Sequence, residues 1–331
     1  MDGGMKVGRT GIALFVLVAC GWVLAARGPV DRAKLNRDPD AAKLVTSDFA
    51  NFWRAYDLAA VAASRPDRAA IYKREYLDKG SPGLKDFLDL RINSADALTF
   101  AIEHHPKYYA SLKSQTPRVA EMEPGIRASL RKLKELYSDA VFPDVYFLIG
   151  VMNSGGTTGD SGLLIGFEMN AETPETDMTE MDDWHKAVLG STEKLPGIVA
   201  HELIHYQQVE EHKTLLAASI HEGSADFIGE MISGMSINDH LRAYGDAHEA
   251  DLWREFSQEM NGTKTSNWLY QGDKSKDRPA DLGYYIGYRI AQSYYEHASD
   301  KKQAIRDILT VSDFASFLRD SHYGEKFGAK I

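Results

Sequence analysis

The segment at residues 198–208, IVAHELIHYQQ, constrains this 331-residue chain more than any other, because it carries a His-Glu-x-x-His pattern. Pro196 suits the first turn of a helix, where its missing N–H is no loss, and the apolar residues that follow recur at helical spacing. On such a helix His201 and His205 share one face and can bind one metal ion. Glu202 is turned about 100° from His201, so it can reach a metal-bound water but not the metal itself.

A second segment, residues 219–234 (SIHEGSADFIGEMISG), has a helical pattern of apolar residues and Gly234 as its stop. Its Glu222 follows His205 by 17 residues, which is enough to finish one helix, turn and return along a second. Two histidines and a glutamate, with a fourth position left for water, are a known ligand set for catalytic zinc. Asp226 then serves as the carboxylate that accepts the second N–H of a zinc-bound histidine. The alternative, an acidic face in solvent, is disfavoured by the upstream motif.

These two motifs carry a resemblance to a known class of enzymes. HELIH and the EGSAD that starts at Glu222 resemble the gluzincin branch of zinc metallopeptidases, which includes thermolysin and the zinc aminopeptidases. More closely, the chain resembles a bacterial family of predicted zinc-dependent proteases related to the gliding-motility lipoproteins. DFANFWRAYD (residues 48–57) and GYYIGYRI (residues 283–290) share in this resemblance, which covers residues 45–320. The spacing to Glu222 is slightly shorter than in thermolysin-like enzymes, which leaves the subfamily open.

The resemblance implies a mechanism as well as a fold. Zinc on His201, His205 and Glu222 lowers the pKa of its bound water and polarises the scissile carbonyl of a peptide substrate. Glu202, which is not a ligand, takes the proton as general base and passes it to the leaving amine. The resemblance also calls for a Tyr, His or Arg that stabilises the oxyanion beside the zinc.

Residues 281–297, DLGYYIGYRIAQSYYEH, are the best source of that donor. Their apolar residues form a core face that leaves the tyrosines to point elsewhere, and two glycines would allow another element to approach closely. We predict Tyr285 as the donor and regard Tyr284 and Tyr288 as the next candidates. Packing or surface roles remain open for all three. His221, next to the predicted glutamate ligand, is a further candidate.

Three interpretations compete, and the match at Glu222 and Asp226 disfavours one of them, a helical envelope protein with a chance motif. Of the other two, the first is an exported zinc metallopeptidase that acts on a peptide or protein substrate. The second is a non-catalytic zinc-binding assembly or motility-type factor on the same fold. Glu202 favours the peptidase, because a structural zinc site fills all four positions with protein ligands and has no use for a general base.

The first 26 residues have the features of an export signal rather than of a folded domain. Lys6 and Arg9 precede an uncharged apolar run at residues 11–26, which is short for a bilayer span. Cys20, the only cysteine, ends LVAC, which resembles the bacterial lipobox. We predict lipid attachment at Cys20. Because the residues after Cys20 stay apolar, two alternatives are left open: cleavage after Ala25 or Ala26, and an uncleaved anchor. The expected location is the bacterial cell envelope, at the membrane.

Composition excludes two further possibilities. A net charge of −10 disfavours nucleic acid as a partner, because phosphates need a basic surface. The chain after Cys20 contains no cysteine, so disulfides cannot hold it together and a hydrophobic core must stabilise it.

The periodicity predicts a mainly α chain with a small β-hairpin or sheet, an α+β fold that carries the two-helix zinc site of a zincin-like architecture. Residues 27–140 form a helical region, which Pro124-Gly125 is expected to break. Helices within it are predicted at residues 65–77, 95–103 and 126–137. The catalytic region, residues 141–331, comprises a hairpin at 142–170, zinc helices at 195–234 and C-terminal helices at 237–320.

The hairpin prediction rests on two β-rich runs, VYFLIGVM and GLLIGFEMN, with the turn-like NSGGTTGDS between them. The second strand is the candidate edge strand for an extended substrate, although a purely structural hairpin remains open. GFEMN resembles the Gly-x-Met-Glu-Asn motif by which zinc aminopeptidases bind a free substrate amine, but Glu168 and Met169 are transposed. Because alternate strand residues face opposite sides, we expect cleavage that does not depend on a free N-terminus.

Overall fold

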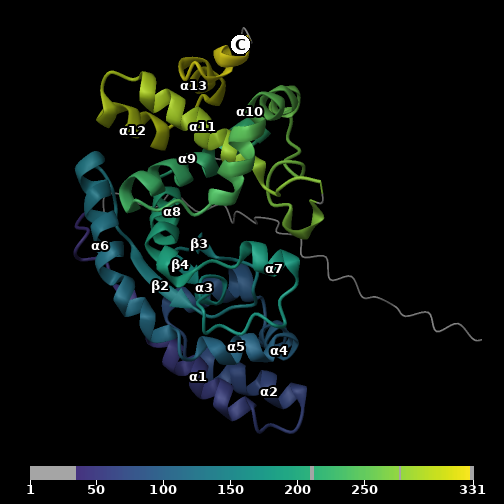
Figure 1. Ribbon diagram of the computed structural model, residues 1–331. Helices are drawn as coiled ribbons and strands as arrows, with labels where there is room; N and C mark the ends of the chain where they lie inside the picture. Colours follow the sequence, from purple (N-terminus) through teal and green to yellow (C-terminus); the bar gives the residue numbers. More distant parts are fainter. Residues whose placement is uncertain (1–34, 209–211, 276, 329–331) are drawn as a thin grey trace, which may run out of the picture.

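The structure is a computed structural model that describes residues 35–208, 212–275 and 277–328. The predicted anchor segment, residues 1–26 with Cys20, lies outside the described residues. The described part is mainly helical with one small sheet, which confirms the prediction of an α+β chain at this level (Figure 1). None of its helices has both the length and the apolar character needed to cross a bilayer.

The N-terminal region is helical because its apolar residues recur at three- and four-residue steps. In α1 (Ser47–Ala59) this spacing buries Phe49, Phe52 and Trp53. The predicted helices are confirmed, but Pro124 lies inside one continuous helix, beyond its first turn, instead of breaking it. The further helices here are α2 (Arg65–Tyr72, continued by a π-helical turn to Leu77), α3 (Pro82–Phe87), α4 (Ala95–His104), α5 (Pro106–Leu112) and α6 (Val119–Leu136).

The sheet corrects the predicted hairpin. Its strands are β1 (Leu44–Val45), β2 (Asp144–Leu148), β3 (Gly156–Thr158) and β4 (Gly162–Gly166), in the order β1-β2-β4-β3. The two predicted strands, β2 and β4, pair in parallel, and β3 arises from the supposed turn and pairs antiparallel with β4. Both apolar runs are buried on both faces, as is usual for parallel strands, and this burial favours the parallel pairing.

The C-terminal part consists of helices that pack around α8 and α9. These two helices confirm the predicted zinc-motif helices at residues 195–234. In Figure 1 the sheet and α1–α5 lie on one side of α8, and α10–α13 lie on the other. β1, from the N-terminal region, pairs with β2, so the sheet spans the predicted boundary at residue 140. The helices are α7 (Asp183–Val188), α8 (Leu195–Gln207), α9 (Leu215–Ser233), α10 (Asp239–Glu259), α11 (Leu282–His297), α12 (Lys301–Leu309) and α13 (Phe314–Asp320).

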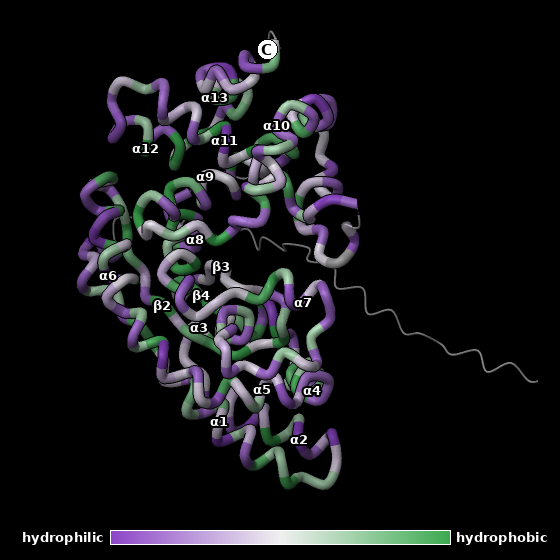
Figure 2. The backbone as a smooth tube through the Cα atoms, viewed as in Figure 1, coloured by the Kyte–Doolittle hydropathy of each residue, from purple (hydrophilic) through white to green (hydrophobic). Residues whose placement is uncertain are grey.

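Hydrophobic residues gather where α8 and α9 pack in the middle of the molecule, and many hydrophilic residues lie on α10 and α13 (Figure 2). Helices α9 and α11 approach each other backbone to backbone. A Cβ at Gly287 would lie 1.6 Å from the main-chain oxygen of Ser219, and one at Gly223 would lie 2.0 Å from the nitrogen of Tyr288. Only glycine fits at these two crossings, which confirms the expectation of a close approach in this segment.

Candidate metal centre

Helix α8 carries the His-Glu-x-x-His motif into the centre of the molecule. Pro196 lies in its first turn, as predicted, and apolar residues bury the helix on nearly every side. Helix α9 ends at Gly234, whose φ of 72° is the left-handed conformation that a helix stop favours. Because both helices are packed almost all round, the polar side chains between them are also buried.

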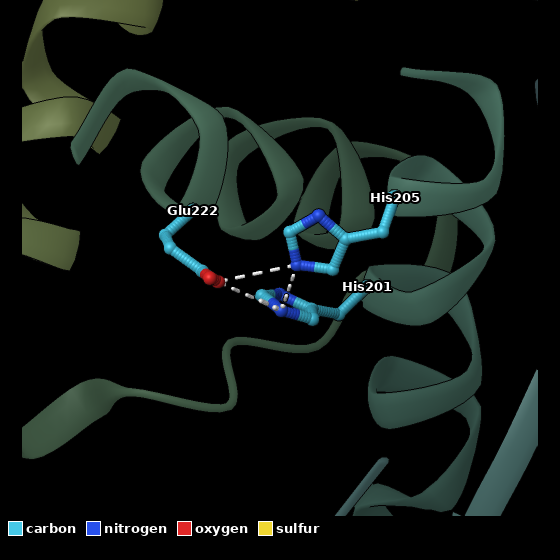
Figure 3. Close-up of side chains that lie close together, drawn as sticks. All are labelled: His201, His205 and Glu222. Atoms are coloured by element: carbon cyan, nitrogen blue, oxygen red, sulfur yellow. Dashed lines mark hydrogen bonds and ion pairs between the residues drawn. The ribbon is translucent and has the colours of Figure 1, made fainter. Parts of the chain in front are cut away.

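Three acceptor atoms converge between α8 and α9 (Figure 3). The Nε2 atoms of His201 and His205 lie 2.9 Å apart, and Oε2 of Glu222 lies 3.1 Å from His205 Nε2 and 3.7 Å from His201 Nε2. Ligands about 2.0 Å from a zinc ion at tetrahedral angles lie roughly 3.3 Å from one another. The three side chains therefore fit a zinc ion, and they are the three predicted ligands.

Asp226 lies where the sequence analysis placed it. Its Oδ1 is 2.8 Å from Nδ1 of His201, and its Oδ2 accepts a hydrogen bond of 2.8 Å from the amide of Asn238. With its N–H donated to Asp226, His201 presents the lone pair of Nε2 to the cluster.

Gln208 holds the second histidine, His205, as Asp226 holds His201. The sequence did not lead us to predict this role for Gln208. The Nε2 group of Gln208 donates to the main-chain oxygen of His221 at 2.9 Å, so the orientation of its amide is determined. Its Oε1 lies 2.7 Å from Nδ1 of His205 and can only accept. The Nε2 atoms of both histidines thus face each other and the Glu222 carboxylate, an arrangement that a shared cation, either a proton or a metal ion, stabilises. The signal that could have found Gln208 is its position three residues after His205, directly after the end of α8.

The carboxylates of the cluster favour a positive charge between the ligands. Burial opposes the charged form of His201, but hydrogen bonds with Asp226 and Glu222 outweigh it and hold the pKa of His201 well above its usual range. Burial also opposes the charge of Glu222. The neighbouring His205 and the hydrogen bonds from both histidines outweigh burial there, so the pKa of Glu222 lies well below its usual range.

Glu202 lies beside the cluster, against the edge strand β3. Burial raises the pKa of its carboxyl group, although the two histidines of the motif oppose the shift. Oε2 of Glu202 has no hydrogen-bond partner in the described part of the chain. A Cβ at Gly156 would lie 2.4 Å from Oε1, so glycine at this position makes room for the carboxylate. A buried carboxylate with a raised pKa, and with one oxygen unpaired among the described residues, suits a general base.

The prediction for Tyr285 is not supported by its position, because its ring packs on Gly245 of α10 and its hydroxyl donates to Asp246 at 2.9 Å. The tyrosine on the cluster side of α11 is Tyr284, whose ring lies over that of His201 with centroids 6.3 Å apart. Its hydroxyl makes no hydrogen bond within the described residues. The helical repeat explains the difference, since adjacent residues point about 100° apart and only packing decides which of them faces the cluster of His201, His205 and Glu222.

The remaining two candidates have other contacts. The hydroxyl of Tyr288 donates to Glu230 at 3.1 Å. The ring of His221 stacks on that of His205, with centroids 4.6 Å apart, and offers no atom to the three-residue cluster. Burial, followed by the nearby His205, lowers the pKa of His221 well below its usual range, so this ring is neutral.

Glu168 cannot reach a substrate amine. It lies in a 3-10 turn, Phe167–Met169, and its side chain is 0% exposed. Its Oε1 accepts the N–H of Met152 at 3.2 Å, and its Oε2 has no partner in the described part. The buried position agrees with the expectation that this glutamate does not select free N-termini.

Glu168 should make the stability of the protein depend on pH. Burial raises its pKa from the ordinary value of 4.5 to about 7, because main-chain N–H groups only partly oppose the loss of water. The folded state then holds the proton more tightly than the unfolded chain, so the free energy of unfolding falls as pH rises from 4.5 to about 7. The expected fall is about 3 kcal/mol. Urea unfolding of Glu168→Gln should lack this fall, and identical pH profiles for the two proteins would contradict the assignment.

His205→Ala should lose most of its bound zinc, because it removes one of three protein ligands. The same holds for His201→Ala and Glu222→Ala. A matched control is His248→Ala, which removes an exposed histidine of α10 and should retain one zinc per chain. Elemental analysis of the purified proteins measures the result, and full zinc in His205→Ala would contradict the ligand assignment.

Asp226→Asn should weaken zinc binding by about ten- to a hundredfold, the usual effect of losing a partner behind a ligand. The two oxygens of Asp226 face two N–H donors, the ring of His201 and the amide of Asn238. The amide of asparagine would turn its own N–H group toward one of these donors, so one hydrogen bond would be lost. Competition titration with a chelator measures the affinity. A wild-type affinity in Asp226→Asn would show that the 2.8 Å contact with His201 does not support the metal site.

A comparison with known protein families gave a match that spans all the residues of the cluster. A family model described as gliding motility protein GldB matches residues 56–325, more than half of the chain and all of α8 and α9. Neither curated proteins nor solved structures gave a match. The match confirms the predicted relation to the gliding-motility lipoproteins. The chain belongs to the gliding motility protein GldB family.

Proposed function

We propose that this chain is a zinc-dependent metallopeptidase that hydrolyses peptide bonds in a peptide or protein substrate. The observation that carries the proposal is the convergence of three acceptor atoms from His201, His205 and Glu222 at zinc-ligand spacing. The buried Glu202 beside them supplies a base that a purely structural site does not need. The same cluster supports a gluzincin-type, zincin-like arrangement of the two helices.

The residues of the chain suggest how hydrolysis proceeds. A zinc ion held by His201, His205 and Glu222 would lower the pKa of a coordinated water and would polarise the scissile carbonyl. Glu202 accepts the proton of that water and later delivers it to the leaving amine. Tyr284 replaces Tyr285 as the proposed oxyanion donor, because its ring lies over His201 and its hydroxyl has no hydrogen-bond partner among the described residues.

The edge strand that would hold the substrate is β3 and not the predicted second strand. That second strand, β4, lies between β2 and β3, so both of its edges are occupied. β3 ends the strand order, and its outer edge pairs with no strand in the described residues. Because Gly156 of β3 lies against Glu202, an extended peptide paired with this edge would pass the general base.

A second candidate is a non-catalytic zinc-binding assembly or motility-type factor on the same fold. The family description, a gliding motility protein, supports this candidate. So does the burial of the cluster, in which Glu222 is 1% and His201 7% exposed to solvent. Glu202 favours the peptidase, since a site that only binds metal needs no buried base.

We also propose that the protein is exported and lies at the bacterial cell envelope. Membership in a family of gliding-motility lipoproteins supports this location. The apolar N-terminal segment with Cys20 supports a lipid anchor at the membrane.

One experiment separates the two candidate functions. The purified protein is incubated with a peptide library, once with zinc and once with a chelator, and the cuts are identified by mass spectrometry. A peptidase gives cuts that disappear with the chelator. Zinc-loaded protein that leaves the whole library intact would favour the binding factor instead.

A further inference from the structure

The two carboxylate oxygens of Glu222 have different partners. Oε2 faces His205 Nε2 at 3.1 Å, while Oε1 accepts a hydrogen bond of 2.7 Å from the hydroxyl of Tyr270. Tyr270 belongs to the segment between α10 and α11, far from both motifs in the sequence. Because Glu222 is almost completely buried, its carboxylate oxygens need partners within the fold, and the phenol satisfies Oε1.

Tyr270 is held in an unusual conformation. Its φ is 58°, in the left-handed region that non-glycine residues rarely adopt. Asp281, at the other end of the segment, has a φ of 63°. The main-chain N–H of Gln271 donates to Asp281 Oδ1 at 2.8 Å, and the N–H of Asp281 donates to Gln271 Oε1 at 2.9 Å. Unfavourable backbone conformations persist where the surroundings hold them and gather at functional sites.

The residues before Tyr270 hold the segment to the core. Trp268 and Leu269 are both fully buried, and the N–H of Gly283 donates to the main-chain oxygen of Trp268 at 2.7 Å. The hydroxyl of Tyr270 donates to Oε1 of Glu222 at 2.7 Å, and a phenol keeps this proton at neutral pH. A fixed segment therefore delivers a permanent hydrogen-bond donor to one oxygen of the glutamate.

We infer that Tyr270 is a positioning residue of the metal centre, which occupies Oε1 of Glu222 and so presents this glutamate as a one-oxygen ligand. The inference rests on the proposed zinc site. A carboxylate that bound through both oxygens would use the position that a catalytic site keeps for water. Without the phenol, Oε1 would be buried and unpaired, and Glu222 would either turn away or bind through both oxygens.

Tyr270 and Tyr284 consequently have separate tasks. The hydroxyl of Tyr270 is committed to Glu222, whereas that of Tyr284 makes no hydrogen bond in the described part. Only Tyr284 is therefore free to bond to a substrate oxygen without breaking a contact behind the metal. This division predicts that loss of the Tyr270 hydroxyl changes metal binding itself.

The test is Tyr270→Phe in the full chain, which keeps the ring and its packing and removes only the hydroxyl. Zinc affinity, measured by competition with a chelator, should fall about ten- to a hundredfold. Cobalt(II) in place of zinc should show weaker visible absorption bands, because binding through two oxygens raises the coordination number above four. Gln271→Ala removes the hydrogen bond from the N–H of Asp281 to Oε1 of Gln271, so it should reproduce part of the loss of affinity.

The matched control is Tyr285→Phe, which also removes a hydrogen bond between a phenol and a carboxylate, here to Asp246 at 2.9 Å. Its zinc affinity and cobalt spectrum should equal those of the wild type. Wild-type values for both in Tyr270→Phe, or an equal loss in Tyr285→Phe, would overturn the inference. A wild-type chain that binds zinc with the predicted Tyr270 effect but cuts no peptide would leave the inference standing and overturn the proposed peptidase alone.

Discussion

Glu202→Gln should abolish peptide hydrolysis while the zinc content stays at one per chain. Glutamine has the shape of glutamate, so it fits the space beside Gly156, but its amide cannot accept the proton of a metal-bound water. Loss of a general base typically costs about a hundred- to ten-thousandfold in rate. Because Glu202 is not among the three residues of the cluster, the metal should remain. Elemental analysis and the peptide assay on the same sample measure both results.

The control for this substitution is Glu296→Gln, which makes the same chemical change at an exposed position of α11. It should keep both the zinc and the rate of the wild type. A Glu202→Gln protein that still cuts peptides at the wild-type rate would remove Glu202 from the mechanism. A protein that loses its zinc would show instead that Glu202 supports the metal directly.

Gly287→Ala should destabilise the fold by about 3 kcal/mol or more, at the upper end of the effect of overpacking. The added Cβ would lie 1.6 Å from the main-chain oxygen of Ser219, and backbone cannot move aside as a side chain can. Helices α9 and α11 would have to separate, and α9 carries Glu222. We therefore expect a lower thermal midpoint and weaker zinc binding together, measured by circular dichroism and chelator competition.

Gly155→Ala is a suitable comparison. A Cβ at this position would lie 3.5 Å from the amide nitrogen of Asn170, which is an ordinary van der Waals contact. Its stability should change by less than about 1 kcal/mol, in line with the usual range for compatible glycine sites. If Gly287→Ala unfolds at the wild-type temperature, the two helices are not packed backbone to backbone.

The sequence by itself determined the local parts of this protein. Helical periodicity, Pro196 and Gly234 located the two motif helices, because these signals act within a few residues of one another. The four-residue spacing of His201 and His205 placed both rings on one face before any tertiary contact was known. Zinc binding and peptide hydrolysis remain predictions from these motifs.

Only the tertiary structure decided which distant residues meet. The pairing of β2 with β4 depends on burial of both sheet faces, which a turn-like sequence between them concealed. Whether Tyr284 or Tyr285 faces His201 depends on how α11 is rotated against α9 and α10. Tyr270 lies 48 residues from Glu222 in the sequence, in a segment without periodicity. Its hydrogen bond to Glu222 arises from long-range packing that no local pattern encodes.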